Sequence, residues 1–193
     1  DGDLCVLCGR CKSVCPILGA DTVKNLVDDA VAYAYVASND EFVRSGSSGG
    51  AFSLIMDAFS EIGGEFAIIG AVMDGTEVRH TAFHNRKSAD ALRKSKYVQS
   101  LTTGIFREVA QMLKKDTRVL FSGTPCQVAA LKRYLGYDDA NLLTVDIVCH
   151  GVPSQTLFDE YVKETETQHN AKVVWAEFRY KQDLTRKIQI PAH

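Results

Sequence analysis

Apolar residues recur along the chain with two spacings, and the spacing changes from segment to segment. Apolar positions three or four residues apart predict helices over residues 52–62, 102–114, 126–135 and 155–167. Short runs rich in β-branched and aromatic residues predict strands over residues 31–36, 66–73, 76–83, 118–121, 142–148 and 172–180. A short helix is expected over residues 88–94.

The order of these elements predicts a mixed sheet. Asp74-Gly75 is a dipeptide typical of tight hairpins, so the strands on either side of it are expected to pair antiparallel. In the second half of the chain, strands and helices alternate, which is typical of parallel strands joined by right-handed crossovers. Helices are therefore expected to flank a partly parallel sheet.

Before the first predicted strand lies a dense cysteine motif. Its cysteines are spaced two, two and three residues apart and a proline follows, in the order Cys5, Cys8, Cys11, Cys15 and Pro16. This is the bacterial ferredoxin spacing, which predicts thiolate ligands of a 4Fe-4S cluster. Cys15 either closes this cluster or ligates a second one, as the fourth cysteine does in two-cluster ferredoxins. A zinc knuckle and a disulfide pair are the alternatives.

The motif divides the chain into two expected domains. Residues 1–20 form a ferredoxin-type segment, half of a two-cluster domain, and residues 30–193 form an oxidoreductase domain that is truncated at its C-terminus. The chain begins without methionine and close to its first cysteine, so we expect it to be a piece of a longer protein. The predicted fold class is α/β with α+β elements: a small ferredoxin-like cluster lobe, then a mixed, partly parallel sheet flanked by helices.

The amino-acid composition argues against some classes of binding partner. The chain has 193 residues, 46% of them hydrophobic, and a net charge of −2 from 22 basic and 24 acidic residues. Without a basic run, no nucleic-acid partner is expected. No apolar run approaches the roughly 20 residues of a membrane span, so no transmembrane segment is expected. Six cysteines in this pattern fit a reducing cytoplasm.

Further candidate residues lie in a glycine-rich loop and in two histidines. The loop Ser45–Gly50 leads into a predicted helix, and its amides could bind a phosphate or merely form a linker before an ordinary capped helix. A basic, hydroxyl-bearing connector follows at residues 94–100. His80 and His84 lie in a polar stretch and are expected at the surface.

The remaining two cysteines occupy equivalent places. Cys126 and Cys149 each follow a predicted parallel strand, where α/β sheets bind their ligands. If the two strands are neighbours, both sulfurs point into one crevice. There they share a cluster with ligands outside this chain, act as a redox dithiol, or are structural. His150 is the next ligand candidate, and Asp146 is expected on the polar side of its strand.

Four segments together resemble one family, the beta subunits of coenzyme F420 hydrogenases and dehydrogenases, which are flavin and iron-sulfur proteins. The residues that carry the resemblance are 47–53, 95–100, 121–131 and 145–154. The resemblance extends over essentially the whole chain from Cys5 onward.

The resemblance implies an oxidoreductase whose FAD exchanges hydride with a deazaflavin such as coenzyme F420, while 4Fe-4S clusters supply single electrons. It implies that Lys96 is catalytic, because its charge near the flavin ring would favour the anionic reduced form. It also implies that Cys126 and Cys149 ligate a cluster beside the flavin, with the other ligands beyond His193. The implied flavin-binding residues are Ser48, Gly49, Gly50, Ser95, Lys96, Tyr97, Ser100 and Thr124.

The implied partners are hydrogenase or dehydrogenase subunits or another redox protein, together with a small-molecule hydride acceptor. That acceptor could equally be another flavin, a nicotinamide or a redox protein, because a fold does not specify a substrate. A non-catalytic, ferredoxin-like electron-carrier or docking subunit is the main alternative function. A zinc-stabilised binding module is the third.

Overall fold

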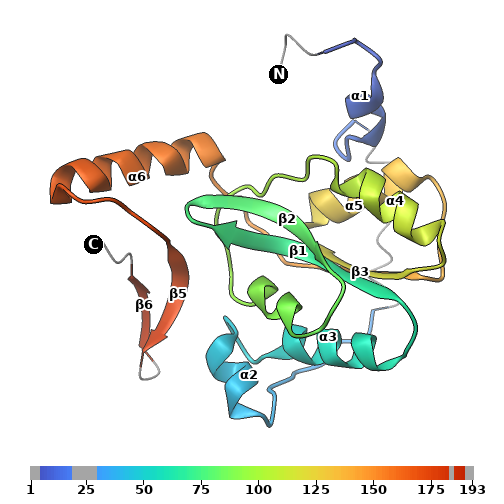
Figure 1. Ribbon diagram of the computed structural model, residues 1–193, viewed down its shortest axis with the longest axis horizontal. Coiled ribbons are helices and arrows are strands. Elements are labelled where there is room, and N and C mark those ends of the chain that lie inside the picture. The colour runs from blue at the N-terminus through green and yellow to red at the C-terminus, as the bar shows by residue number, and fades with distance from the viewer. Residues whose placement is uncertain (1–4, 19–29, 183–184, 190–193) are drawn as a thin grey trace.

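The sheet at the centre of the molecule is mixed, as the sequence predicts. The structure, a computed structural model, describes residues 5–18, 30–182 and 185–189. Antiparallel pairing joins β1 to β2, whereas β3 pairs parallel with both β1 and β4 (Figure 1). In spatial order the strands are β2 (Glu77–Phe83), β1 (Phe66–Asp74), β3 (Arg118–Gly123) and β4 (Leu142–Asp146).

Helices cover both faces of this sheet, because successive residues of a strand point to opposite faces. One face packs against α4 (Ile105–Leu113) and α5 (Pro125–Leu135), and the other against α3 (Ala51–Glu61) and the 3-10 helix η4 (Ser88–Leu92) (Figure 1). Burial on both faces explains why the central strands are continuously apolar. The fold is therefore α/β, with a helical layer on each side of the sheet.

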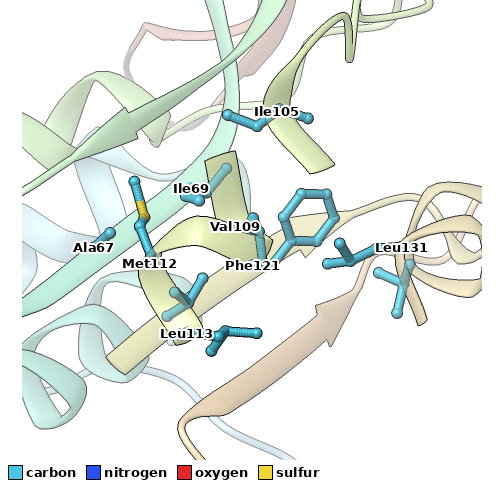
Figure 2. Packing of buried hydrophobic residues seen from close by; sticks show 10 residues of the cluster. Ala67, Ile69, Ile105, Val109, Met112, Leu113, Phe121 and Leu131 are labelled. Atoms are coloured by element: carbon cyan, nitrogen blue, oxygen red, sulfur yellow. The ribbon is translucent and has the colours of Figure 1, made fainter. Parts of the chain in front are cut away.

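Each helical layer has its own hydrophobic core. Figure 2 shows the first core, in which the apolar face of α4 is buried. Its members are Ala67, Ile69, Ile105, Val109, Met112, Leu113, Val119, Phe121, Val128 and Leu131. The second core, on the opposite face, contains Met56, Phe59, Ile68, Ala89, Leu92 and Leu120.

The remaining elements lie outside these two layers. A third core, formed by Val78, Val98, Phe158 and Ala176, ties the β1–β2 hairpin to the C-terminal part of the chain. β5 and β6 form a separate two-stranded antiparallel sheet. These outer elements are α1 (Arg10–Val14), α2 (Asp40–Ser45), α6 (Gln155–His169), β5 (Glu177–Gln182) and β6 (Thr185–Gln189).

The strand predicted over residues 31–36 is wrong. This segment forms no strand, and the side chain of Tyr33 is 86% exposed. The chain then passes the glycine-rich loop, where the Ala37 N–H donates to the Gly49 carbonyl at 2.8 Å. A high strand propensity therefore gave no strand here, because the segment has no strand to pair with.

Two other predicted strands are displaced or shortened. The strand expected over residues 142–148 ends at Asp146, because β3 ends opposite it at Gly123. The strand expected over residues 172–180 begins only at Glu177 and pairs with β6 instead of joining the main sheet.

The hairpin turn and the short helix differ from expectation by one or two residues. Asp74 pairs with Glu77, so the turn consists of Gly75 and Thr76, one position later than predicted. Gly75 has φ 59°, a left-handed conformation that glycine adopts without strain. The helix predicted over residues 88–94 is a 3-10 helix that ends at Leu92.

The two-domain division stays a prediction. Residues 1–4 and 19–20 of the expected cluster segment, and residues 183–184 and 190–193 of the second domain, lie outside the described residues. In the described part of the chain, no helix combines the length and the apolar character that crossing a membrane requires.

Candidate functional site

The candidate site lies where β3 and β4 end side by side. Gly123 pairs with Asp146 at the carboxyl ends of the two parallel strands, and the Ile147 N–H donates to the Gly123 carbonyl at 2.9 Å. Cys126 lies in the first turn of α5, directly after β3, and Cys149 lies in the loop after β4. Their strands are therefore neighbours, as expected, and both side chains are exposed.

Each of these sulfurs has a hydrogen-bonding neighbour. The Cys126 Sγ lies 3.1 Å from the Thr124 Oγ1, and the Cys149 Sγ accepts a bond from the Gly151 N–H at 3.3 Å. Asp146 is exposed, which confirms its expected place on the polar side of β4. The site thus offers two exposed thiols at one sheet edge.

Ser47 joins the glycine-rich loop to the connector at residues 94–100. Its Oγ accepts hydrogen bonds from the Ser95 N–H at 2.6 Å and from the Ser95 Oγ at 2.9 Å. The loop then enters α3, whose first turn has no side-chain cap. Uncapped amides at the start of an 11-residue helix are suited to an anion.

Close backbone packing also requires glycine in this loop. A Cβ on Gly49 would lie 2.7 Å from the Tyr35 carbonyl oxygen, and Gly50 has φ 81° at the start of α3. The loop is therefore a packed turn and not a linker. Backbone packing alone therefore explains why glycine occupies these positions, without reference to any ligand.

His80 is buried, so the expectation that it lies at the surface is wrong. Its exposed fraction is 8%, and its ring stacks on Phe121 with the ring centroids 5.3 Å apart. Nε2 lies 3.1 Å from the Ser122 carbonyl oxygen and Nδ1 lies 3.0 Å from the Ser100 Oγ. Burial lowers the pKa of His80, and the hydrogen bond to Ser122 raises it by less. His84 is exposed, as expected.

A buried glutamine extends this contact to the candidate site. The Gln127 Nε2 donates to the Ser100 Oγ at 2.9 Å, and its Oε1 accepts from the Thr124 N–H at 3.0 Å. Gln127 is 8% exposed and lies next to Cys126 in the first turn of α5. The connector and the cysteine turn are thus joined through buried side chains.

Sequence reasoning missed this network, although one signal was present. Val78, His80 and Ala82 alternate along β2, and the first two of them are buried. A period of two places a histidine on the core side of its strand. Its partners, Ser100 and Gln127, come from segments whose proximity no local pattern encodes.

Comparison with known proteins places these residues in a family. Residues 116–191, which include both strand-end cysteines, match the family model for the C terminus of the coenzyme F420 hydrogenase/dehydrogenase beta subunit. This part of the chain is therefore similar to that family of beta subunits. The resemblance noted in the sequence is thereby confirmed. No curated protein sequence matches the chain.

A solved structure supports the fold. The chain is similar to one in a xenon-derivatised structure of the F420-reducing NiFe hydrogenase complex from Methanosarcina barkeri, with a TM-score of 0.57 and 18% sequence identity. The similarity covers 81% of this chain and 57% of that chain. At this identity the match concerns the fold. This chain spans little more than half the length of its structural relative.

The Lys96 ammonium, which the beta subunit family implies near a flavin ring, is turned toward the backbone. Its Nζ donates to the carbonyl oxygens of Ala91, Leu92 and Arg93 at 3.2, 3.0 and 2.6 Å. Burial, and secondarily the charge of Lys94, lower the pKa of Lys96 to about 8. The three donors of the ammonium therefore cap the end of η4.

Tyr97, next in the connector, packs against the strand β5. Its ring centroid lies 5.7 Å from that of Phe178 and 5.4 Å from the Arg179 guanidinium carbon. Lys94 also forms an ion pair with Glu177. The C-terminal hairpin therefore covers this part of the connector.

The N-terminal cysteine motif docks on the opposite end of α5. Arg133 donates from Nε and from a terminal guanidinium nitrogen to the Ser13 carbonyl at 3.1 and 2.8 Å. The Arg10 guanidinium carbon lies 5.0 Å from the centroid of the Tyr134 ring. Arg133 lies seven residues after Cys126 in α5, so about 10 Å of helix separates this contact from Cys126.

Thiols are suitable ligands for iron, but among the described residues the cysteine side chains do not come together in groups of three or more. All six cysteines are free, and Cys5, Cys8 and Cys11 are exposed. Within the described ranges, no three His, Cys, Asp or Glu side chains converge as metal ligands. The donor chemistry is that of an iron-sulfur protein, and the ligation itself stays a prediction.

Proposed function

We propose that the chain is an iron-sulfur flavoprotein oxidoreductase that passes electrons between 4Fe-4S clusters and a flavin. One observation carries the proposal. Three segments far apart in sequence are joined side by side: Ser47 bonds to Ser95, and Ser100 in the same connector bonds to Gln127 beside Cys126. To hold a flavin beside a cluster, the loop that binds the flavin's phosphates must lie close to the cysteines that ligate the cluster.

Each segment has a defined part in this proposal. The uncapped start of α3, with Ser48, Gly49 and Gly50, would bind the FAD phosphates, while the connector residues Ser95, Tyr97 and Ser100 and the turn residue Thr124 would contact the flavin. When bound, FAD supplies the exchange between hydride and single electrons. The hydride partner is a deazaflavin such as coenzyme F420, and the electrons come from partner subunits.

The cysteines divide into two groups. Cys5, Cys8, Cys11 and Cys15 would ligate a 4Fe-4S cluster at the N-terminal lobe, residues 1–20. Cys126 and Cys149 would ligate part of a second cluster at the edge of the main domain, residues 30–193. The six free thiols support the proposal that the protein functions in a reducing compartment, the cytoplasm.

Anaerobic reconstitution with iron, sulfide and FAD tests this function. We expect one chain to retain both flavin and cluster absorption after gel filtration. Replacing Ser95 by Ala removes the hydroxyl that bonds to Ser47, and it should weaken FAD retention several-fold. Ser60→Ala, at the far end of α3, is the matched control and should leave it unchanged. Cluster absorption with no flavin retained would overturn the enzyme proposal.

One observation favours the electron-carrier alternative. The Lys96 ammonium is fully engaged by backbone carbonyls, so in this arrangement it does not present its charge to a ring. An electron carrier would transfer electrons to its partner at the same rate after Lys96→Met. A flavin-dependent enzyme would slow, because the reduced flavin loses a nearby cation.

A further inference from the structure

A continuous line of hydrogen bonds runs through the core toward the Cys126 sulfur, and its direction can be deduced. The Ser122 carbonyl only accepts, so the Nε2 of His80 carries the proton. In the neutral imidazole the Nδ1 is then an acceptor, and the Ser100 hydroxyl donates to it. The Ser100 Oγ in turn accepts from the Gln127 amide nitrogen.

This direction fixes the orientation of the glutamine. With its nitrogen toward Ser100, the Gln127 Oε1 faces Thr124 and accepts its N–H at 3.0 Å. The Thr124 hydroxyl then has two neighbours, the Gln127 Oε1 and the Cys126 Sγ, each 3.1 Å away. The hydroxyl can rotate between them without any other group moving.

We propose that His80 is a positioning residue for Cys126: through Ser100 and Gln127 it sets the direction of the network and holds the Thr124 hydroxyl against the sulfur. Because the Thr124 hydroxyl is both a donor and an acceptor, it can accept from a thiol at this sulfur and can donate to a sulfur that ligates a metal. Hydrogen bonds to cluster sulfurs are a means by which proteins tune a cluster.

The surroundings of His80 keep this direction constant. Its imidazole contacts are uncharged: the Phe121 ring, the Ser122 carbonyl and the Ser100 hydroxyl. Burial lowers the pKa of the ring, so it stays neutral at neutral pH. The network itself does not depend on bound cofactors, whereas its use in tuning a sulfur ligand rests on the proposed function.

Gln127→Glu tests the direction of the network. A carboxylate cannot donate to Ser100, so the Ser100 hydroxyl must turn toward Glu and the His80 Nδ1 must take up a proton. NMR of labelled imidazoles in the metal-free chain should show a neutral His80 with its proton on Nε2. In the Gln127→Glu variant the pKa of His80 should rise by one unit or more, because a buried carboxylate favours the charged ring. An unchanged His80 titration would overturn the proposal.

Thiol alkylation tests whether the network reaches the sulfur. In the metal-free chain, the rate at which iodoacetamide modifies Cys126 is measured by mass spectrometry, with Cys149 as the internal reference. His80→Phe keeps a ring to stack on Phe121 but removes both hydrogen bonds. At neutral pH it should lower the ratio of the two rates by up to about fivefold, the worth of roughly one hydrogen bond, because alkylation proceeds through the thiolate, which loses a stabilising donor.

His84→Gln, an exposed histidine just beyond the same strand, is the matched control and should leave the ratio unchanged. A folded His80→Phe protein with an unaltered ratio would overturn the proposal. If that variant does not fold, the NMR test on Gln127→Glu still decides. Both measurements use protein without cofactors, so absence of flavin or iron binding would contradict the proposed function and leave this inference standing.

Discussion

Burying His80, Ser100 and Gln127 removes polar groups from water, which costs free energy unless every group finds a partner. In this core each of the three side chains has partners on both sides. A single apolar replacement would leave a neighbour unsatisfied, at about 1–3 kcal/mol. The identity of each of these residues therefore depends on its hydrogen-bond partners and not on the strand or helix in which it lies.

At the same scale, Lys96 should make stability depend on pH. Its pKa of about 8 lies below the ordinary value of 10.5, so between these values the unfolded chain binds more protons and stability rises with pH. Compared with Lys96→Met, the wild-type chain should gain up to about 3 kcal/mol of unfolding free energy across this window. Urea denaturation of both proteins at several pH values measures the difference. A difference that stays constant with pH would contradict the prediction.

Gly49→Ala should destabilise the chain through a backbone clash. The added Cβ would lie 2.7 Å from the Tyr35 carbonyl oxygen, so the loop must move, at a cost of about 1–3 kcal/mol. Gly63→Ala places its Cβ in open space and has only the strain of φ 89°, so it should cost about 1 kcal/mol. Thermal unfolding of the two variants compares them. Equal losses would show that the close approach to Tyr35 is not rigid.

At the scale of elements, α5 connects the two cysteine groups. Its first turn holds Cys126, and its last turn holds the α1 segment through Arg133 and Tyr134. The hydrophobic pattern predicted this helix and its end at Gly136, because helical periodicity and a left-handed C-cap are local signals. The docking of α1 depends on the Arg133 side chain and the Ser13 carbonyl, which are 120 residues apart, so no local pattern predicts it.

Removing this contact should loosen the cysteine motif. In the double variant Arg10→Ala and Arg133→Ala, hydrogen exchange of the α1 amides should accelerate about threefold to tenfold, since the lost contacts are exposed and weak. Lys132→Ala, an exposed neighbour on α5, is the control and should change nothing. Exchange rates that match the wild type would show that α1 is held by other contacts.

At the scale of the whole molecule, the sheet edge brings together residues that the chain separates widely. Parallel pairing of β3 with β4 places the turns after both strands at one edge, which is why two matched cysteines could be predicted as neighbours. The match to the beta subunit family covers this part of the chain. The predicted strands at residues 31–36 and 172–180 were wrong or displaced, because pairing partners and not propensity decide strands.

The two cysteine groups should bind iron independently. Changing Cys5, Cys8 and Cys11 to Ser should abolish the N-terminal cluster, whereas changing Cys126 and Cys149 should leave it intact, because different segments supply the ligands. Iron and sulfide per chain, with electron paramagnetic resonance of the reduced protein, measure this. Loss of all iron in both variants would contradict it, and bound zinc in a colourless protein would favour the binding module.

Local sequence patterns predicted three helices to within three residues of their observed ends at 51–61, 105–113 and 125–135. They also predicted the β1–β2 hairpin and the family resemblance that residues 116–191 support. Each of these depends on residues close together in the chain. The folded structure was needed to show that Ser47 bonds to Ser95, that Lys96 faces backbone carbonyls and that His80 is buried. Such contacts follow from how layers pack around the sheet, which no local spacing of residues encodes.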